Sequence, residues 1–108
     1  YPDGNIDQSR IFNTIGMLAQ AITEAGSATD VVAVASKLEG MEYDSMWGGK
    51  LFMRPQDHQI IQDMHVGVHT NDNLDFDYDQ SGYGVVTEST VEMASMDSPT
   101  PCEMKRPE

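Results

Sequence analysis

The chain has 108 residues, which is enough for one modest domain with a single core but not for two. Its 18 acidic and 6 basic residues give a formal net charge of -12, so charge repulsion excludes nucleic acid and anionic membrane surfaces as partners. No apolar run approaches the roughly 20 residues that cross a bilayer, and the start of the chain lacks the regions of a signal peptide.

The chain opens in a polar Pro/Gly stretch without an initiating Met and then enters a helical pattern, so we expect it to be a fragment of a longer polypeptide. Cys102 is the single cysteine and has no partner for an internal disulfide. In a longer protein it could pair with a cysteine elsewhere.

The first predicted element is an amphipathic helix from Ser9 to Ala25. Its ends are marked by Asp7 or Ser9 as cap and by Gly26 as the left-handed residue after the last turn. The polar residues Asn13, Gln20 and Glu24 lie opposite the apolar stripe. We expect that stripe to be buried; it consists of Ile11, Phe12, Ile15, Leu18, Ala19, Ile22 and Ala25.

A second helix is predicted from a cap at Thr29 or Asp30 to about Glu39, and Gly40 ends it. It is expected to bury Val31, Val34, Ala35 and Leu38. The segment from Met41 to Gly49 is predicted to be irregular, with a turn at Gly48-Gly49 that leads into a short buried strand at Leu51, Phe52 and Met53.

Alternation of apolar residues from Met64 to Val68 predicts a strand with one covered face. The acidic stretch from Asn71 to Gln80 is predicted to be a solvated loop, and a further strand is expected from Tyr83 to Thr87. A short segment reaches Met96, and the tail with Pro99, Pro101 and Pro107 is expected to be extended.

Three stretches carry a resemblance to a known family. They are LAQAITEAGSATDVVAVASKLEGMEYD, the element Arg54-Pro-Gln-Asp57-His58-Gln59, and Gly82-Tyr83-Gly84 with the closing Cys102 to Pro107. In order and spacing they resemble the extracellular ligand-binding receptors of branched-chain amino acid ABC transporters, which are type I periplasmic binding proteins.

The resemblance implies an α/β fold with two lobes that close on a small ligand, and no enzymatic activity or cofactor. It implies that residues 1–60 are the C-terminal contribution to lobe 1. Residues 61–108 would supply a crossover strand at the hinge and a contribution to lobe 2, with an extended tail. The implied partners are a branched-chain amino acid or related small polar ligand, an ABC permease in the membrane and the remainder of the same two-lobed protein, in the periplasm.

The resemblance carries one ligand contact over to Phe12, with Ser9 nearby as a second candidate. Phe12 also fits the apolar stripe, so core packing is the competing interpretation. Most of the family's pocket lies in earlier parts of the chain, so this stretch is expected to lack most of it.

Other polar groups have simpler interpretations. Asp57-His58-Gln59 is expected to fix a loop by hydrogen bonds, because neighbours on an extended segment point apart and no nucleophile has a recognisable spacing. His65 and His69 are expected on one exposed side of a strand, well separated, rather than on a metal.

The alternative function comes from Asp77-x-Asp79-x-Ser81-Gly82 followed by Glu88, which has the spacing of an EF-hand calcium loop. Against it, Gly84 takes the place of an apolar residue, and no entering helix or second hand is evident. A solvated acidic turn is the competing interpretation. The alternative protein would be a free-standing acidic structural or calcium-binding module.

Overall fold

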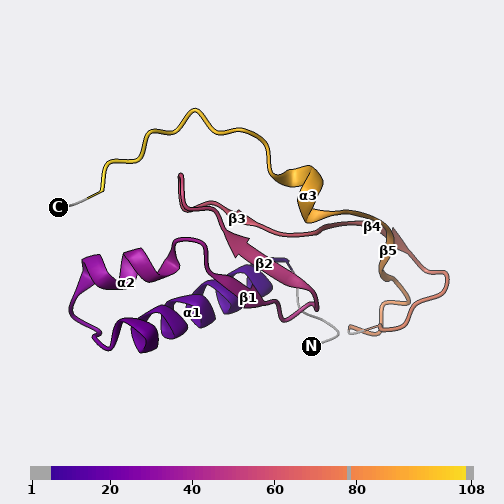
Figure 1. Cartoon of the computed structure of the whole chain (residues 1–108). Coiled ribbons are helices and arrows are strands. Elements are labelled where there is room, and N and C mark those ends of the chain that lie inside the picture. Colours follow the sequence, from indigo (N-terminus) through magenta and orange to yellow (C-terminus); the bar gives the residue numbers. More distant parts are fainter. Residues whose placement is uncertain (1–5, 78, 107–108) are drawn as a thin grey trace.

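The computed structural model of the chain describes residues 6–77 and 79–106. Two helices and a small sheet form one unit, called the body here, and a long two-stranded ribbon projects from it (Figure 1). The elements in chain order are α1 (Ile6–Ala25), α2 (Val31–Leu38), β1 (Glu42–Asp44), β2 (Lys50–Met53), β3 (Ile60–Ile61), β4 (Met64–Thr70), β5 (Gly84–Val91) and α3 (Met93–Met96).

Both long helices were predicted, and local chemistry sets their ends. Gly26 adopts a φ of 68° after α1, and its N–H donates to the carbonyl of Ile22. The Asp30 side chain caps α2 by accepting from the N–H of Ala33. At the other end of α1 the prediction was wrong, because Asp7 and Ser9 both lie inside the helix.

Most of the predicted apolar stripe of α1 is not buried, although Ile22 and Ala25 at its C-terminal end pack against the core. Ile11, Phe12 and Ile15 are more than half exposed, and Leu18 is 44% exposed. The buried row instead repeats every four residues and is made of smaller, polar or flexible side chains, a spacing that keeps one helix face. Its members are Ser9, Asn13, Met17 and Ala21.

A close approach between α1 and the sheet explains why this face of the helix is buried. A Cβ atom built on Gly16 would overlap the hydroxyl of Tyr43 and lie 2.6 Å from Tyr43 Cζ. Only glycine admits the Tyr43 ring at this point, so the helix presents Gly16 to β1 and directs its larger apolar residues outward.

The core lies between the helices and the inner face of the sheet. It consists of Met17, Ala21, Val34, Met41, Leu51 and Met53, with Ala25, Leu38 and Ile60 packed against it. The burial predicted for Val31 was wrong, since it is 76% exposed at the first turn of α2.

The sheet of the body is antiparallel, in the order β1-β2-β3. Gly48 and Gly49 both have positive φ and form the predicted turn before β2. The prediction of an irregular segment before that turn was wrong for Glu42 to Asp44, because Tyr43 pairs with Leu51 in the ladder. Strand β3 is only two residues long and was not predicted.

The ribbon pairs β4 with β5 in antiparallel register, from Met64 opposite Val91 to Thr70 opposite Gly84. Both strands were predicted, but the covered face was not confirmed, because Val66 and Val68 are 46% and 42% exposed. The loop 71–80 contains no helix or strand among its described residues, as predicted.

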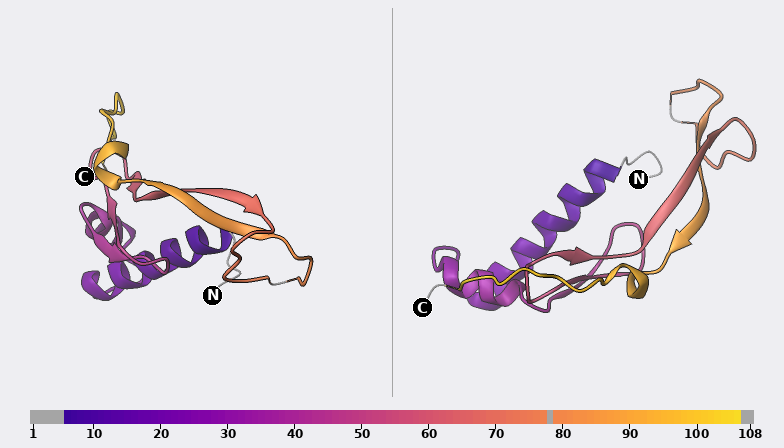
Figure 2. Two further views of the ribbon diagram at one scale, coloured as in Figure 1. Left: turned by 90° about the vertical axis from the view of Figure 1, so that its right-hand side faces the viewer. Right: turned by 90° about the horizontal axis from the view of Figure 1, so that it is seen from above.

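The chain is extended, with a radius of gyration of 17.1 Å against about 13 Å for a compact chain of this size. Figure 2 shows the ribbon reaching away from the helices, while the C-terminal segment runs back along the body. Residues 97–106 lack regular structure, as predicted, and Pro107 lies outside the described residues. No helix in the described part of the chain combines the length and the apolar character that a membrane span requires.

The close approach of Gly16 to Tyr43 predicts a change in stability of opposite sign to the usual effect of the same substitution. Replacing glycine with alanine inside a helix normally raises stability by about 1 kcal/mol. We expect Gly16→Ala instead to lower the free energy of unfolding by about 1 to 3 kcal/mol, because the new methyl group must displace Tyr43. Urea denaturation followed by circular dichroism measures the difference, and a stabilised variant would contradict this packing.

Candidate functional site

A buried amide side chain joins the first half of α1 to the loop between β1 and β2. Asn13 is 2% exposed. Its Nδ2 donates to Ser45 Oγ at 3.2 Å, and its Oδ1 accepts from the N–H of Met46 at 3.1 Å. The Trp47 N–H donates to the same Ser45 hydroxyl. Asn13 therefore fixes the loop that carries the half-exposed Trp47.

The two predicted ligand contacts lie at this end of the helix but in different environments. Ser9 is 3% exposed and belongs to the buried row with Asn13, whereas Phe12 is 54% exposed. Phe12 therefore lies outside the core that this chain forms. A role of Phe12 and Ser9 in ligand binding remains a prediction.

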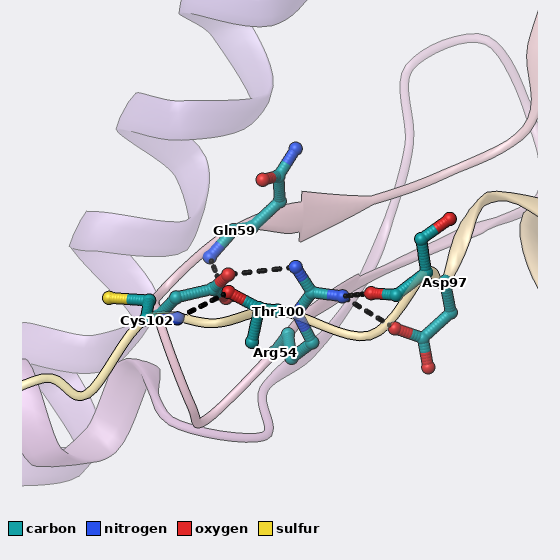
Figure 3. Close-up of polar contacts among 7 residues, drawn as sticks. Arg54, Gln59, Asp97, Thr100 and Cys102 are labelled. Carbon is teal, nitrogen blue, oxygen red and sulfur yellow. Dashed lines mark hydrogen bonds and ion pairs between the residues drawn. The ribbon is translucent and has the colours of Figure 1, made fainter.

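A second polar centre forms where β2 ends, around Arg54. This side chain is 8% exposed, and Figure 3 shows it between the turn after β2 and the C-terminal segment. Nε donates to Asp57 Oδ1 at 3.0 Å and Nη2 donates to Asp57 Oδ2 at 2.7 Å. Nη1 donates to Asp97 Oδ1 at 2.8 Å and to the Ser98 carbonyl at 2.5 Å. One guanidinium thus joins a local turn to residues more than 40 positions away.

The hydrogen bonds between Arg54 and Asp57 favour the ionised form of each of these two side chains. They hold the pKa of Asp57 well below its usual range, with smaller contributions from the Gln59 N–H and the Thr100 hydroxyl. The same bonds, first with Asp57 and then with Asp97, raise the pKa of Arg54. A carboxylate held ionised by a fixed cation is suited to positioning rather than to proton transfer.

A third polar group lies beside this turn. Glu39 Oε1 accepts from Arg106 Nε at 2.6 Å and lies 3.2 Å from His58 Nε2. The hydrogen bond from Arg106 is the main reason that the pKa of Glu39 is lowered. The Arg106 guanidinium also donates to the Pro55 carbonyl through Nη2.

The loop-fixing role predicted for Asp57-His58-Gln59 is confirmed. Asp57 accepts from the Gln59 N–H and from Arg54, and His58 adopts a positive φ of 55°. The distant partners Asp97 and Arg106 were missed. The only sequence signal was the isolation of Arg54, since no Lys or Arg occurs between it and Lys105.

The histidines of the ribbon do not form a shared site. His65 Nδ1 lies 3.0 Å from Thr90 Oγ1 across the strands. His69 stacks on Tyr83, with ring centroids 5.5 Å apart. The expectation that both are exposed on a strand is confirmed.

The loop with EF-hand spacing has the form of a turn that opens into a strand. Asp77 Oδ2 accepts from the Gly82 N–H, and Asp79 Oδ1 accepts from the Ser81 N–H. Glu88 lies within β5, at a bulge where the register shifts. Asp77 Oδ1 is buried without a hydrogen-bond partner. Within residues 6–77 and 79–106, no three His, Cys, Asp or Glu side chains are grouped to hold a metal ion.

Comparison with known proteins gives one match. Residues 1–73 match the model of a family described as periplasmic binding protein. The match includes both long helices, the sheet of the body and β4. A search of curated proteins found no match, and neither did a search of solved structures.

The lowered pKa of Asp57 makes the free energy of unfolding depend on pH. Its pKa is lowered in the folded state, so its contribution to stability is fully present above the ordinary aspartate pKa and is lost as the pH falls well below that value. We expect Asp57→Asn to lower the urea midpoint strongly at neutral pH and much less in acid. Asp75→Asn, in the loop beyond the ribbon, is the control and should change the midpoint little. An Asp57→Asn effect that is equal at both pH values would contradict the ion pair.

Asn13 should govern the order of the loop that it holds. Asn13→Ala removes the acceptor of the Met46 N–H, so hydrogen exchange at this amide should accelerate, with a loss of stability of about 1 to 3 kcal/mol. Thr14→Ala is the matched control, because it removes only an exposed hydroxyl that donates to the Arg10 carbonyl within α1. Unchanged exchange at Met46 in Asn13→Ala would show that the loop is held by other contacts.

Proposed function

This chain belongs to the periplasmic binding protein family, and we propose that it acts as part of the solute-binding component of an ABC importer. The family has a solute-binding role and its members are generally non-enzymatic. The proposed ligand is a branched-chain amino acid or a related small polar molecule, which the complete protein would deliver to a membrane permease. The proposed location is the periplasm.

The family match is the observation that carries the proposal, because it extends over both long helices and into the ribbon. The proposed contact at Phe12 is consistent with its exposure. The exposed Phe12 ring offers apolar surface for an aliphatic side chain, the kind of surface that lines most small-molecule sites.

We propose that the exposed apolar row of α1 packs against another part of the same protein. Ile11, Ile15 and Leu18 form a contiguous stripe of a kind that soluble proteins rarely leave uncovered. We propose that residues 1–60 contribute to one lobe and residues 61–108 to the hinge and the second lobe. The remaining elements of that two-lobed protein would then cover the stripe.

Ligand titration monitored by the backbone amide spectrum tests the proposal. We expect L-leucine, L-isoleucine or L-valine to shift the amide signals at the start of α1, whereas L-aspartate should not. Phe12→Ala should raise the dissociation constant about tenfold, which corresponds to a loss of about 1.4 kcal/mol of binding free energy. Leu18→Ala, an exposed apolar residue two turns away on the same helix, is the control.

Two results would contradict the proposal. One is the absence of any shift at α1 with all three branched-chain amino acids at saturating concentration. The other is an equal loss of affinity in Phe12→Ala and Leu18→Ala, which would assign the effect to the helix surface in general.

A further inference from the structure

The ribbon is connected to the body in two ways. One connection is covalent, through the short segment between β3 and β4. The other is non-covalent: after β5 and α3 the chain returns along the body as residues 97–106, here called the strap (Figures 1 and 2). The orientation of the ribbon relative to the body therefore depends on how firmly the strap is held.

Two anchors hold the strap. The near anchor is Arg54 Nη1, which donates to Asp97 Oδ1 and to the Ser98 carbonyl. The far anchor is Arg106, which donates to Glu39 Oε1 and to the Pro55 carbonyl, both at 2.6 Å. Between the anchors, the Thr100 hydroxyl contributes a hydrogen bond to Asp57. The structure shows no regular backbone ladder along the strap.

The near anchor has a fixed half and an exposed half. Asp57 binds Arg54 through two parallel hydrogen bonds, and both side chains are nearly buried, with 11% and 10% exposure. Asp97 is 53% exposed in the same cluster. Asp57 therefore keeps the guanidinium oriented, with Nη1 directed at the strap, whether or not Asp97 is bound.

The far anchor is also solvent-accessible, since the side chains of Arg106 and Glu39 are 50% and 24% exposed. Exposed ion pairs are individually weak and are further weakened by salt. A few hydrogen bonds and ion pairs thus hold the strap on the body. The ribbon is held by a continuous ladder of backbone hydrogen bonds, and the core is held by side-chain packing. Few contacts of this kind are typical of segments with low local stability.

We propose that the strap is a releasable clasp that sets the angle between the ribbon and the body. The Arg54–Asp97 and Glu39–Arg106 links hold it closed. Its role in controlling how the two lobes open and close rests on the proposed function, in which β4 crosses between the lobes. The clasp itself is a property of this chain, and its test requires no solute.

Distances between pairs of spin labels, measured by double electron–electron resonance on the full chain, test the clasp. The first pair uses the native Cys102 in the strap and Ser36→Cys on the exposed side of α2. The second pair uses Ser36→Cys with Thr87→Cys in the ribbon, in a Cys102→Ser background. The test variant is D97N/R106Q, which removes the ion pair from each anchor.

The matched control is D44N/R10Q, which makes the same two chemical changes at exposed residues outside the strap. We expect D97N/R106Q to broaden both distance distributions and to shift the strap distance to longer values. D44N/R10Q should give the narrow distributions of the parent chain. Far-UV circular dichroism confirms that each variant keeps its helices.

Two outcomes would overturn the proposal. If D97N/R106Q keeps a narrow strap distance, the ion pairs do not hold the strap. If the strap distance broadens while the ribbon distance stays narrow, the strap does not set the ribbon angle. Neither outcome depends on amino-acid binding, so a failure of the solute-binding proposal remains distinguishable from a failure of the clasp.

Discussion

The contact between Gly16 and the Tyr43 ring determines how α1 lies on the sheet, and the other features of the body depend on that orientation. With Gly16 against β1, the row that contains Asn13, Met17 and Ala21 points inward. Asn13 then meets the loop after β1, and Met17 meets the core around Leu51. The apolar row of Ile11, Ile15 and Leu18 is left on the outside.

Arg54 plays the corresponding role for the rest of the chain. It is one of the few cations in a strongly acidic protein, and it lies at the point where the sheet, the turn after β2 and the returning strap meet. The ribbon itself buries little side-chain surface, so its placement relies on its two connections to the body. The proposed clasp would make the stiffness between ribbon and body adjustable, because Asp97 and Arg106 in its ion pairs are half-exposed.

Local signals in the sequence were sufficient for the helices, the Gly48-Gly49 turn and the long strands, because caps, glycines and alternation act within a few residues. The buried face of α1 was not predictable from hydrophobic periodicity. That pattern identifies an apolar row but not what covers it. In this chain the contact between Gly16 and Tyr43 determines which face of α1 is buried. Strands β1 and β3 were missed because three and two residues are too short to show a period. At the polar centre, Asp57 and Gln59 were recognised, but Asp97 lies too far along the chain for any local pattern to connect it with Arg54.

α1 faces the sheet with Asn13, Met17 and Ala21 and faces solvent with Ile11, Ile15 and Leu18. Paramagnetic broadening by a soluble nitroxide or gadolinium chelate measures this directly at the side-chain methyl groups. The account predicts strong broadening of Ile11 and Ile15 and protection of Met17 and Leu51. Protection of Ile11 and Ile15 in the monomeric chain, with broadening of Met17, would contradict it.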